Sequence, residues 1–221
     1  MKIKILYEDS NILAIDKPSG ILVHPDNTNK EKTILDLFIK KYPKIEIVHR
    51  LDKETSGVML LAKNKKAHEF LKKQFQDREI KKIYLAVVSG YMKNDRGVIN
   101  KPIGRSPKDF RRHLAGRGAR GEMREAITQY RVLKRFEDIK GNKFTFIELH
   151  PKTGRTHQIR VHMKYLNHPV ACDSLYNPNS VCPLGLKRLA LHAKFIEFKN
   201  LKREIIKVES PLLKEFIKLQ K

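Results

Sequence analysis

Short apolar stretches bounded by turn residues recur along most of the chain. Asp, Asn, Pro or Gly flanks each stretch, and this pattern is typical of β-strands separated by turns. It predicts strands at residues 3–7, 12–15, 58–62, 83–89, 98–103, 127–136, 144–149, 190–198 and 205–208.

Apolar residues recur at helical spacing in three further segments. Thr33 is placed to cap a helix that Pro43 ends, and Asn64 opens a second helix. A third helix is predicted over residues 156–166, and a short one from Leu212. The apolar stripes of the first three are predicted to be Leu35, Phe38, Ile39 and Tyr42, then Ala67, Phe70, Leu71 and Phe75, then Ile159, His162, Met163 and Leu166.

Many strands with few intervening helices favour the α+β class, with a mixed, mainly antiparallel sheet and flanking helices. A chain of 221 residues can bury one sizeable core, or two small lobes that share a sheet. We therefore expect a single domain over residues 1–221. The same pattern of many strands and few helices disfavours a doubly wound nucleotide-binding fold. No GxxxxGK[ST] motif occurs and no GxGxxG directly follows a predicted strand, so no nucleotide cofactor is expected.

The chain is strongly basic, with 47 Lys and Arg against 24 Asp and Glu. A formal charge of +23 can attract a polyanion such as RNA, although a generally basic proteome would raise the charge equally. Residues 101–124 hold eight Lys or Arg against two acids and predict a mobile basic loop. Its arginines could follow phosphates or be solvated surface charge, and their clustering favours the first. The candidates are Arg111, Arg112, Arg117 and Arg120.

The sequence contains no apolar run long enough to span a membrane, which needs about eighteen residues. Its start, MKIKILYEDS, lacks the apolar segment of a signal peptide, so we expect a cytoplasmic protein. Cys172 and Cys182 are too few for a disulfide framework or a cysteine-rich zinc site. Both are predicted to be ordinary core or loop residues.

The segment HRLDKETSG, residues 49–57, places a carboxylate among basic and hydroxyl residues. Arg50 precedes Asp52, while Thr55 and Ser56 follow it, so a cation and hydrogen bonds can hold the carboxylate ionised and oriented. An oriented carboxylate can act as a base or a nucleophile. The alternative is an Asx-type turn, which spacing alone favours by roughly three to one.

The segment GRTHQIRVH, residues 154–162, places two arginines and two histidines at the start of the third predicted helix. This density suggests a binding face. His157 and His162 lie five residues apart without an HExxH arrangement, so no metal site is predicted.

Four segments, DKPSGILVHP (16–25), HRLDKETSG (49–57), KIYLAVVSG (82–90) and GRTHQIRVH (154–162), together resemble the four ordered motifs of the RluA-type pseudouridine synthases. The resemblance spans nearly the whole chain. It implies the pseudouridine synthase fold with a central cleft, and an enzyme that isomerises uridine in structured ribosomal or transfer RNA without a cofactor. Many relatives carry an additional RNA-binding domain before the first strand, and we expect this chain to act without one, as a monomer.

The resemblance also implies roles for individual residues. Asp52 corresponds to the catalytic aspartate of the family, and Arg50 to the residue that enters the RNA stack when the target base leaves. Tyr84 resembles the tyrosine that lies against the uracil, and Arg160 the arginine that pairs with the catalytic carboxylate. Ile159 would pack beside the base. For Tyr84, the alternative is a core tyrosine in a strand.

Two other functions remain as alternatives. A non-catalytic RNA-binding or ribosome assembly factor on the same scaffold would be marked by a lost aspartate, whereas Asp52 is present. A metal-dependent nuclease would need several clustered carboxylates, and the motifs offer one. Isomerisation of uridine involves neither oxidation nor hydrolysis, so a pseudouridine synthase requires no cofactor.

Overall fold

The computed structural model describes residues 3–25, 31–116 and 118–220. Two compact units divide the chain. Unit 1 comprises Met1–Lys82 and His192–Pro211, and unit 2 comprises Ile83–Leu191 and Leu212–Lys221. No helix among the described residues is both long and apolar enough to cross a bilayer.

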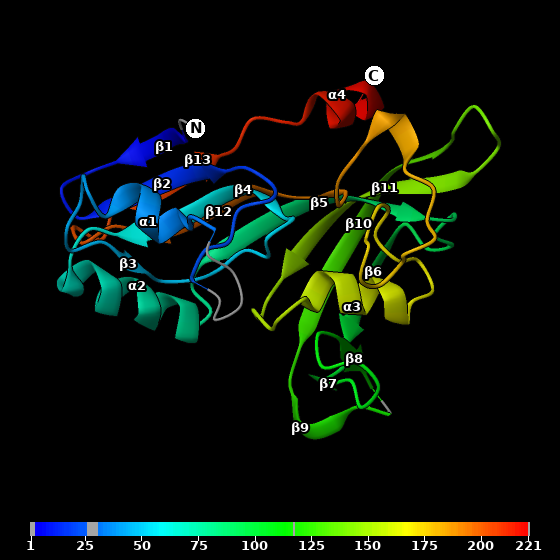
Figure 1. The fold of residues 1–221 in the computed structure, drawn as a ribbon, viewed down its shortest axis with the longest axis horizontal. Coiled ribbons are helices and arrows are strands. Elements are labelled where there is room, and N and C mark those ends of the chain that lie inside the picture. The colour runs from blue at the N-terminus through cyan, green and yellow to red at the C-terminus, as the bar shows by residue number, and fades with distance from the viewer. Residues whose placement is uncertain (1–2, 26–30, 117, 221) are drawn as a thin grey trace. The chain divides into compact units, whose positions relative to one another are not determined.

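The strands of unit 1 follow the order β13-β12-β4-β2-β1, with β3 also paired to β4 (Figure 1). Only β4 and β12 run parallel among these pairs, with Ser56 opposite His192. The bounds are β1 (Lys4–Glu8), β2 (Ile12–Lys17), β3 (Glu46–Ile47), β4 (Ser56–Ala62), β12 (Leu191–Lys199) and β13 (Ile205–Glu209), with helices α1 (Ile34–Phe38) and α2 (Lys65–Gln76).

Local sequence explains the elements of unit 1. Every residue of β4 is buried, which matches its continuous apolar run. The Asn64 side chain accepts a hydrogen bond from the backbone N–H of Ala67 and so caps α2, as predicted. Thr33 caps α1 through a reciprocal capping box with Asp36, but the helix ends at Phe38 instead of continuing to Tyr42.

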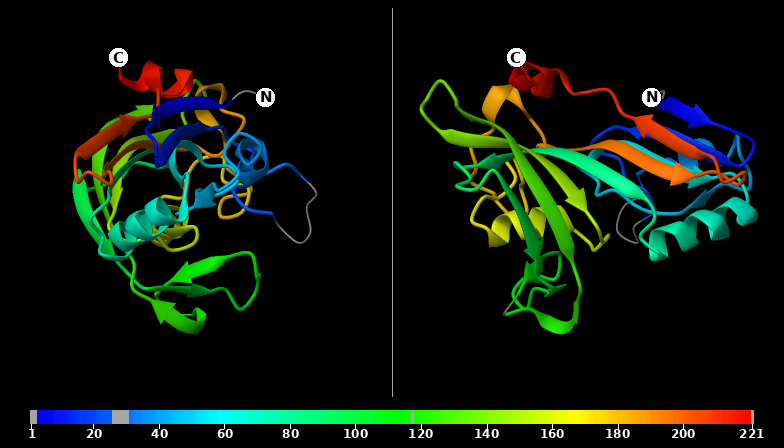
Figure 2. Two further views of the ribbon diagram at one scale, coloured as in Figure 1. Left: turned by 90° about the vertical axis from the view of Figure 1, so that its left-hand side faces the viewer. Right: turned by 180° about the vertical axis from the view of Figure 1, so that it is seen from behind.

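The strands of unit 2 form an antiparallel arrangement in the order β5-β11-β10-β6 (Figures 1 and 2). A separate three-stranded sheet has the order β8-β7-β9. The bounds are β5 (Lys81–Ser89), β6 (Arg96–Asn100), β7 (Ile103–Arg105), β8 (His113–Ala115), β9 (Arg120–Arg124), β10 (Ile127–Glu137) and β11 (Lys143–Pro151), with helices α3 (Gln158–Tyr165) and α4 (Lys214–Gln220) and the 3₁₀ turn η1 (Pro183–Gly185).

Helices α3 and α4 pack against opposite faces of the larger sheet of unit 2. From α3, Gln158 and His162 both hydrogen-bond the hydroxyl of Thr128 in β10. From α4, Phe216 packs on Phe146 of β11, with ring centroids 5.4 Å apart. Phe146 lies on the other face, since successive side chains of a strand alternate between faces and Thr128 pairs with Pro151.

The predicted mobile loop at residues 101–124 is wrong, because this segment contains β7, β8 and β9. Hydrogen bonds from the backbone N–H groups of Lys108 and Asp109 to the Ser106 hydroxyl order the connection between β7 and β8. Ile103 is buried in a small cluster with Val161 of α3. Strands this short have too few apolar residues to show the alternation of apolar and polar positions by which a strand is predicted from sequence.

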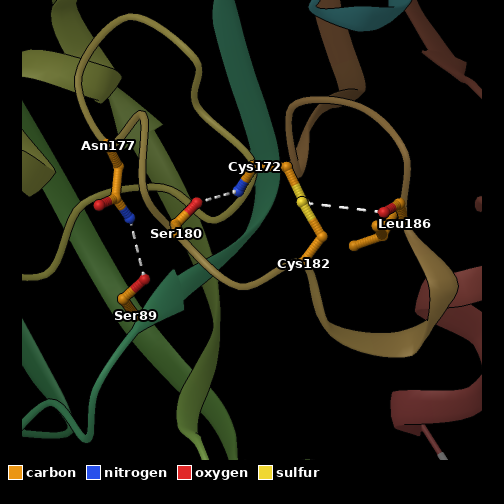
Figure 3. Close-up of a disulfide and its surroundings, with 6 residues drawn as sticks. All are labelled: Ser89, Cys172, Asn177, Ser180, Cys182 and Leu186. Atoms are coloured by element: carbon orange, nitrogen blue, oxygen red, sulfur yellow. Dashed lines mark hydrogen bonds between the residues drawn. A yellow bond between two sulfur atoms is a disulfide. The ribbon is translucent and has the colours of Figure 1, made fainter.

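The prediction for the cysteines is also wrong. Cys172 and Cys182 form a disulfide (Figure 3), with their Cα atoms 5.1 Å apart. A single pair ten residues apart shows no framework in the sequence. The turns of the intervening loop bring the two residues together, and this path is a property of the tertiary structure.

The predicted strand at residues 98–103 is wrong as one element, because β6 ends at Asn100 and β7 begins at Ile103 in another sheet. The remaining strand predictions are confirmed within a few residues, and the α+β class with a mixed sheet is confirmed. The third helix begins at Gln158, later than predicted. His157 therefore precedes the helix as its N-cap, in a left-handed conformation with φ of 54°.

Candidate active site

Asp52 lies between β3 and β4, at the first position of a tight turn. The backbone N–H of Thr55 donates to the carbonyl oxygen of Asp52 at 3.1 Å. The Ser56 hydroxyl hydrogen-bonds Nδ1 of His192 at 2.9 Å. The hydrogen bond between the Thr55 N–H and the Asp52 carbonyl oxygen closes the turn. The residue is partly exposed, whereas its neighbour Leu51 is buried.

A buried lysine holds the far side of this turn. Lys17, at the end of β2, has no exposed surface, and its ammonium donates to three backbone carbonyls. These are the carbonyls of Pro18 at 3.0 Å, Ile21 at 2.9 Å and Lys53 at 3.0 Å. Lys53 directly follows Asp52, so Lys17 fixes the main chain next to the candidate nucleophile. In the sequence, Lys17 ends an apolar strand and belongs to the DKPSGILVHP motif, but neither feature identifies the carbonyls that it binds.

The segment after Lys17 adds two more contacts to the same turn. The N–H of Gly20 donates to the carbonyl of Lys53 at 2.8 Å, and the hydroxyl of Ser19 donates to that of Glu54 at 2.6 Å. The DKPSG and HRLDKETSG motifs are therefore joined through backbone carbonyls. Their joint function is to give the Asp52 turn one conformation.

Gly57 anchors the other end of the turn at the start of β4. Its φ is +116°, and a Cβ at this position would collide with the carbonyl oxygen of Ala193 in β12. Only glycine permits both this backbone conformation and the close approach of the parallel strand. The turn is thus held at Lys53, Glu54 and Gly57.

His49 is a structural residue of this site. Its Nε2 accepts the backbone N–H of Leu60 at 2.9 Å, and its ring packs on Phe75 at 4.7 Å between centroids. Burial and the positive charge of Lys82 lower the pKa of His49 to about 3, and burial lowers the pKa of Lys82 to about 8. His49 is therefore neutral at physiological pH and fixes the chain before Asp52.

Replacing His49 by Gln should reduce the acid sensitivity of the fold. The pKa of His49 is 6.5 in an unfolded chain and about 3 in the folded protein. The unfolded state thus binds more protons in that interval, and the free energy of unfolding falls as pH decreases through it. Gln keeps an acceptor for Leu60 and does not titrate. Urea unfolding at pH 7 and pH 5 should show a smaller loss for the variant, and equal losses would contradict this role.

Two basic side chains adjoin the Asp52 turn. Arg50 is exposed, and so is His24 from the first motif. Burial lowers the pKa of His24, and the charge of Arg50 lowers it further. The first two motifs therefore bring a histidine near the positive charge of Arg50, which lies two residues before the candidate nucleophile.

Unit 2 contains the other three predicted site residues. Tyr84 is partly buried in β5, opposite Leu149, and packs against the core of this unit. Ile159 is 6% exposed and belongs to that core. Arg160 is 3% exposed and lies beside it on α3. Because Asp52 and Arg50 belong to unit 1, the assembly of all five residues into one site stays a prediction.

Arg160 makes a bidentate ion pair that the sequence did not indicate. Its Nε and Nη2 donate to the two carboxylate oxygens of Asp173, each at 2.8 Å. The guanidinium also lies 5.1 Å from the ring centroid of Tyr176. Both partners follow α3 in the chain, outside the GRTHQIRVH motif.

The predicted RNA-contacting arginines divide into three groups. Arg111 donates to both carboxylate oxygens of Asp109, and Arg112 lies 3.4 Å from the same carboxylate. The side-chain and backbone hydrogen bonds from Arg111, together with the charges of both arginines, lower the pKa of Asp109 to about 2. Arg120 is exposed in β9, while Arg117 lies outside the described residues. Phe110, between Asp109 and Arg111, is 88% exposed.

The described residues contain no group of three or more His, Cys, Asp or Glu side chains arranged to hold a metal ion. The chemical groups that the turn of unit 1 presents are a carboxylate, a guanidinium and an imidazole. Unit 2 presents an exposed basic sheet with an aromatic tip. Together these features suit a polyanionic substrate with planar bases.

Comparisons with known proteins agree with this chemistry. The family model described as RNA pseudouridylate synthase matches residues 11–165. An uncharacterized RNA pseudouridine synthase of Bacillus subtilis, YlyB, is 36% identical over 99% of this chain and 72% of its own length. Ribosomal large subunit pseudouridine synthase D of Xanthomonas campestris is 37% identical over 98% of this chain and 68% of its own length.

Other similar proteins match to a different extent. An uncharacterized RNA pseudouridine synthase of Aquifex aeolicus is 42% identical over 79% of this chain, but the match spans only 56% of that relative. Among solved structures, human RNA pseudouridylate synthase domain containing 1 superposes with a TM-score of 0.80 at 28% identity. The superposition covers 95% of this chain and 83% of the human one.

Proposed function

We propose, starting from the fact that this chain belongs to the RNA pseudouridylate synthase family, that Asp52 is the nucleophile with which it isomerises uridine to pseudouridine in ribosomal RNA. The observation that carries the proposal is the Asp52 turn. Lys17, Ser19 and Gly20 hold the main chain after Asp52 through backbone carbonyls, so the main chain that carries the carboxylate has one conformation.

The reaction is an exchange of bonds within one nucleotide. The bond between uracil N1 and sugar C1′ breaks, and a bond between uracil C5 and C1′ forms. C5 then loses its proton and N1 gains one, so the product is an isomer of the substrate. A carboxylate can drive this sequence by attacking the nucleotide or by removing a proton from the sugar.

Asp52 reaches its target only if the uridine leaves the RNA stack. Extruding a nucleotide costs roughly a few kcal/mol. We assign two residues to offsetting this cost. Stacking of the extruded base on Tyr84 contributes about 1–3 kcal/mol, and the exposed Arg50 fills the vacated position with a planar guanidinium.

Arg160 supplies the charge that the carboxylate needs in a site without bulk water. A buried carboxylate is unstable as an anion unless a cation or hydrogen bonds compensate it. Asp173 occupies the edge of the guanidinium formed by Nε and Nη2. We assign the edge formed by Nη1 and Nη2 to Asp52, and the core position of Ile159 suits contact with the uracil.

The substrate is RNA, and we propose large-subunit ribosomal RNA as its class. The support is that several similar relatives are named for that subunit, together with the +23 charge of the chain. We further propose that the protein acts as a monomer in the cytoplasm, where this RNA is assembled. Transfer RNA is the second candidate.

Incubation of the purified protein with unmodified transcripts of both RNA classes tests the proposal. We expect pseudouridine, detected by carbodiimide labelling and primer extension, at discrete positions of the ribosomal transcript. Modification of transfer RNA alone would refute the proposed target. Binding without pseudouridine in either transcript would instead support a non-catalytic assembly factor.

Replacing Phe110 by Ala should weaken RNA binding. An 88% exposed phenylalanine among arginines at the β7–β8 connection suits stacking on an unpaired base. Loss of one stack costs about 1–3 kcal/mol, or roughly 5- to 150-fold in Kd. Because Phe110 carries no charge, the slope of log Kd against log salt should not change.

Ile139→Ala is the matched control for Phe110, because Ile139 is also fully exposed but lies in the β10–β11 connection. Filter binding at two salt concentrations measures both variants. Equal affinity of Phe110→Ala and Ile139→Ala would exclude a stacking role.

A further inference from the structure

The turn that follows α3 holds a buried carboxylate against a buried guanidinium. The side chain of Asp173 is 0% exposed and that of Arg160 is 3% exposed. Buried ion pairs add little net stability, because both charges lose their hydration. A bidentate pair does, however, fix the plane of the guanidinium.

Asp173 is itself held in place by the backbone. Its Oδ1 accepts the N–H groups of Leu175 and Tyr176, both at 3.0 Å. The carboxylate therefore has one orientation, and Arg160 takes its orientation from the carboxylate.

We infer that Asp173 is a positioning residue, which orients Arg160 so that its second edge faces the reacting carboxylate. This inference rests on the proposed function, since it assigns that edge to Asp52. Asp173 uses both Nε and Nη2. The guanidinium is planar, so fixing one edge fixes the direction of the other.

Tyr176 connects this arrangement to the basic three-stranded sheet. Its hydroxyl accepts the backbone N–H of His113 in β8 at 2.9 Å and hydrogen-bonds Nδ1 of His157 at 3.0 Å. Its ring lies 5.1 Å from the Arg160 guanidinium, within a cluster that also buries Ile103 of β7. The sheet that we expect to contact RNA thus adjoins the residues that orient Arg160.

Asp173→Asn tests the role of Asp173 with little change to the loop. Asn keeps Oδ1, which accepts the N–H groups of the turn, but replaces the acceptor for Nε of Arg160 by an amide NH₂. The loss of a hydrogen bond to a charged group predicts a fall in kcat of about 10- to 100-fold. KM for RNA should stay within about twofold of the wild-type value, because Asp173 does not contribute to binding of the RNA in the ground state.

Asp95→Asn is the matched control. Asp95 also pairs with an arginine, Arg135, at 2.6 Å, but on the surface of the same unit. It should have the kcat of the wild type. If both variants lose activity equally, or if Asp173→Asn raises KM without lowering kcat, the inference is wrong. Thermal unfolding of both variants separates a folding defect from an effect on kcat.

A double-mutant cycle with Arg160→Lys gives a readout that a structural role would not change. Lysine cannot form the bidentate pair, so Asp173→Asn should lower the single-turnover rate no further, within about twofold, in that background. If the rate reductions of the two single variants multiply in the double variant, Asp173 acts independently of Arg160, and the inference is wrong.

The cycle also separates the two proposals. If the wild type forms no pseudouridine, the proposed function fails, and this role for Asp173 fails with it. If the wild type is active and Arg160→Lys is impaired, but Asp173→Asn matches the wild type, only the positioning role is refuted.

Discussion

Asp52→Asn is expected to abolish pseudouridine formation, with a loss of at least about 10³-fold in the single-turnover rate, as for other enzymes that lose their nucleophile. Asn has the shape of Asp, but its neutral amide neither attacks carbon nor accepts a proton. The fold should persist, because the turn is closed by the Thr55 N–H and the Asp52 carbonyl, which the substitution keeps. Product formation is measured on saturating ribosomal transcript by carbodiimide labelling.

Glu54→Gln is the matched control, because its carboxylate lies in the same turn. The contact that Glu54 makes with Ser19 uses its main-chain carbonyl, which Gln retains. This variant should keep the wild-type rate, and both variants should keep the wild-type Kd for RNA. An active Asp52→Asn protein would remove Asp52 from the mechanism, even if the wild type is a pseudouridine synthase.

Lys17→Met is expected to destabilise the protein by about 3–6 kcal/mol, since three carbonyls lose the charged donor that the buried lysine supplies, at about 1–3 kcal/mol each, partly offset by relaxation and hydration. Met has nearly the length of Lys and fills the same space, so the effect isolates the hydrogen bonds. The substitution removes the ammonium that donates to the carbonyls of Pro18, Ile21 and Lys53. Urea unfolding of the purified variant measures the change.

Lys44→Met is the control for Lys17, because Lys44 is exposed in the connection before β3. It removes the same charge and should change the free energy of unfolding by less than about 0.5 kcal/mol. Lys17→Met should also lower the rate of pseudouridine formation at saturating RNA, because the main chain next to Asp52 loses its support. Equal stability of the two variants would show that Lys17 does not hold this turn.

The sequence alone predicted the features whose signals are local. The caps at Thr33 and Asn64 involve side chains and N–H groups three residues apart, so spacing reveals them. The strands were visible because their apolar residues are consecutive or alternate. The HRLDKETSG motif singled out Asp52 through its immediate neighbours, and the order of the four motifs indicated the family.

Other features depended on contacts between residues that are distant in the chain. Lys17 and Lys53 are 36 positions apart, and nothing in either local sequence connects an ammonium with that carbonyl. Arg160 and Asp173 are 13 positions apart, and a carboxylate in a loop has no visible partner until the chain turns back on α3.

The sequence by itself thus determined the α+β elements, the family and the candidate nucleophile. Only the tertiary structure decided how that nucleophile's turn and the arginine are each held, that β7–β9 form a sheet, and that Cys172 meets Cys182. The physical reason is that propensity and capping act between near neighbours, while burial pairs a charge with whatever the chain path brings within hydrogen-bonding distance.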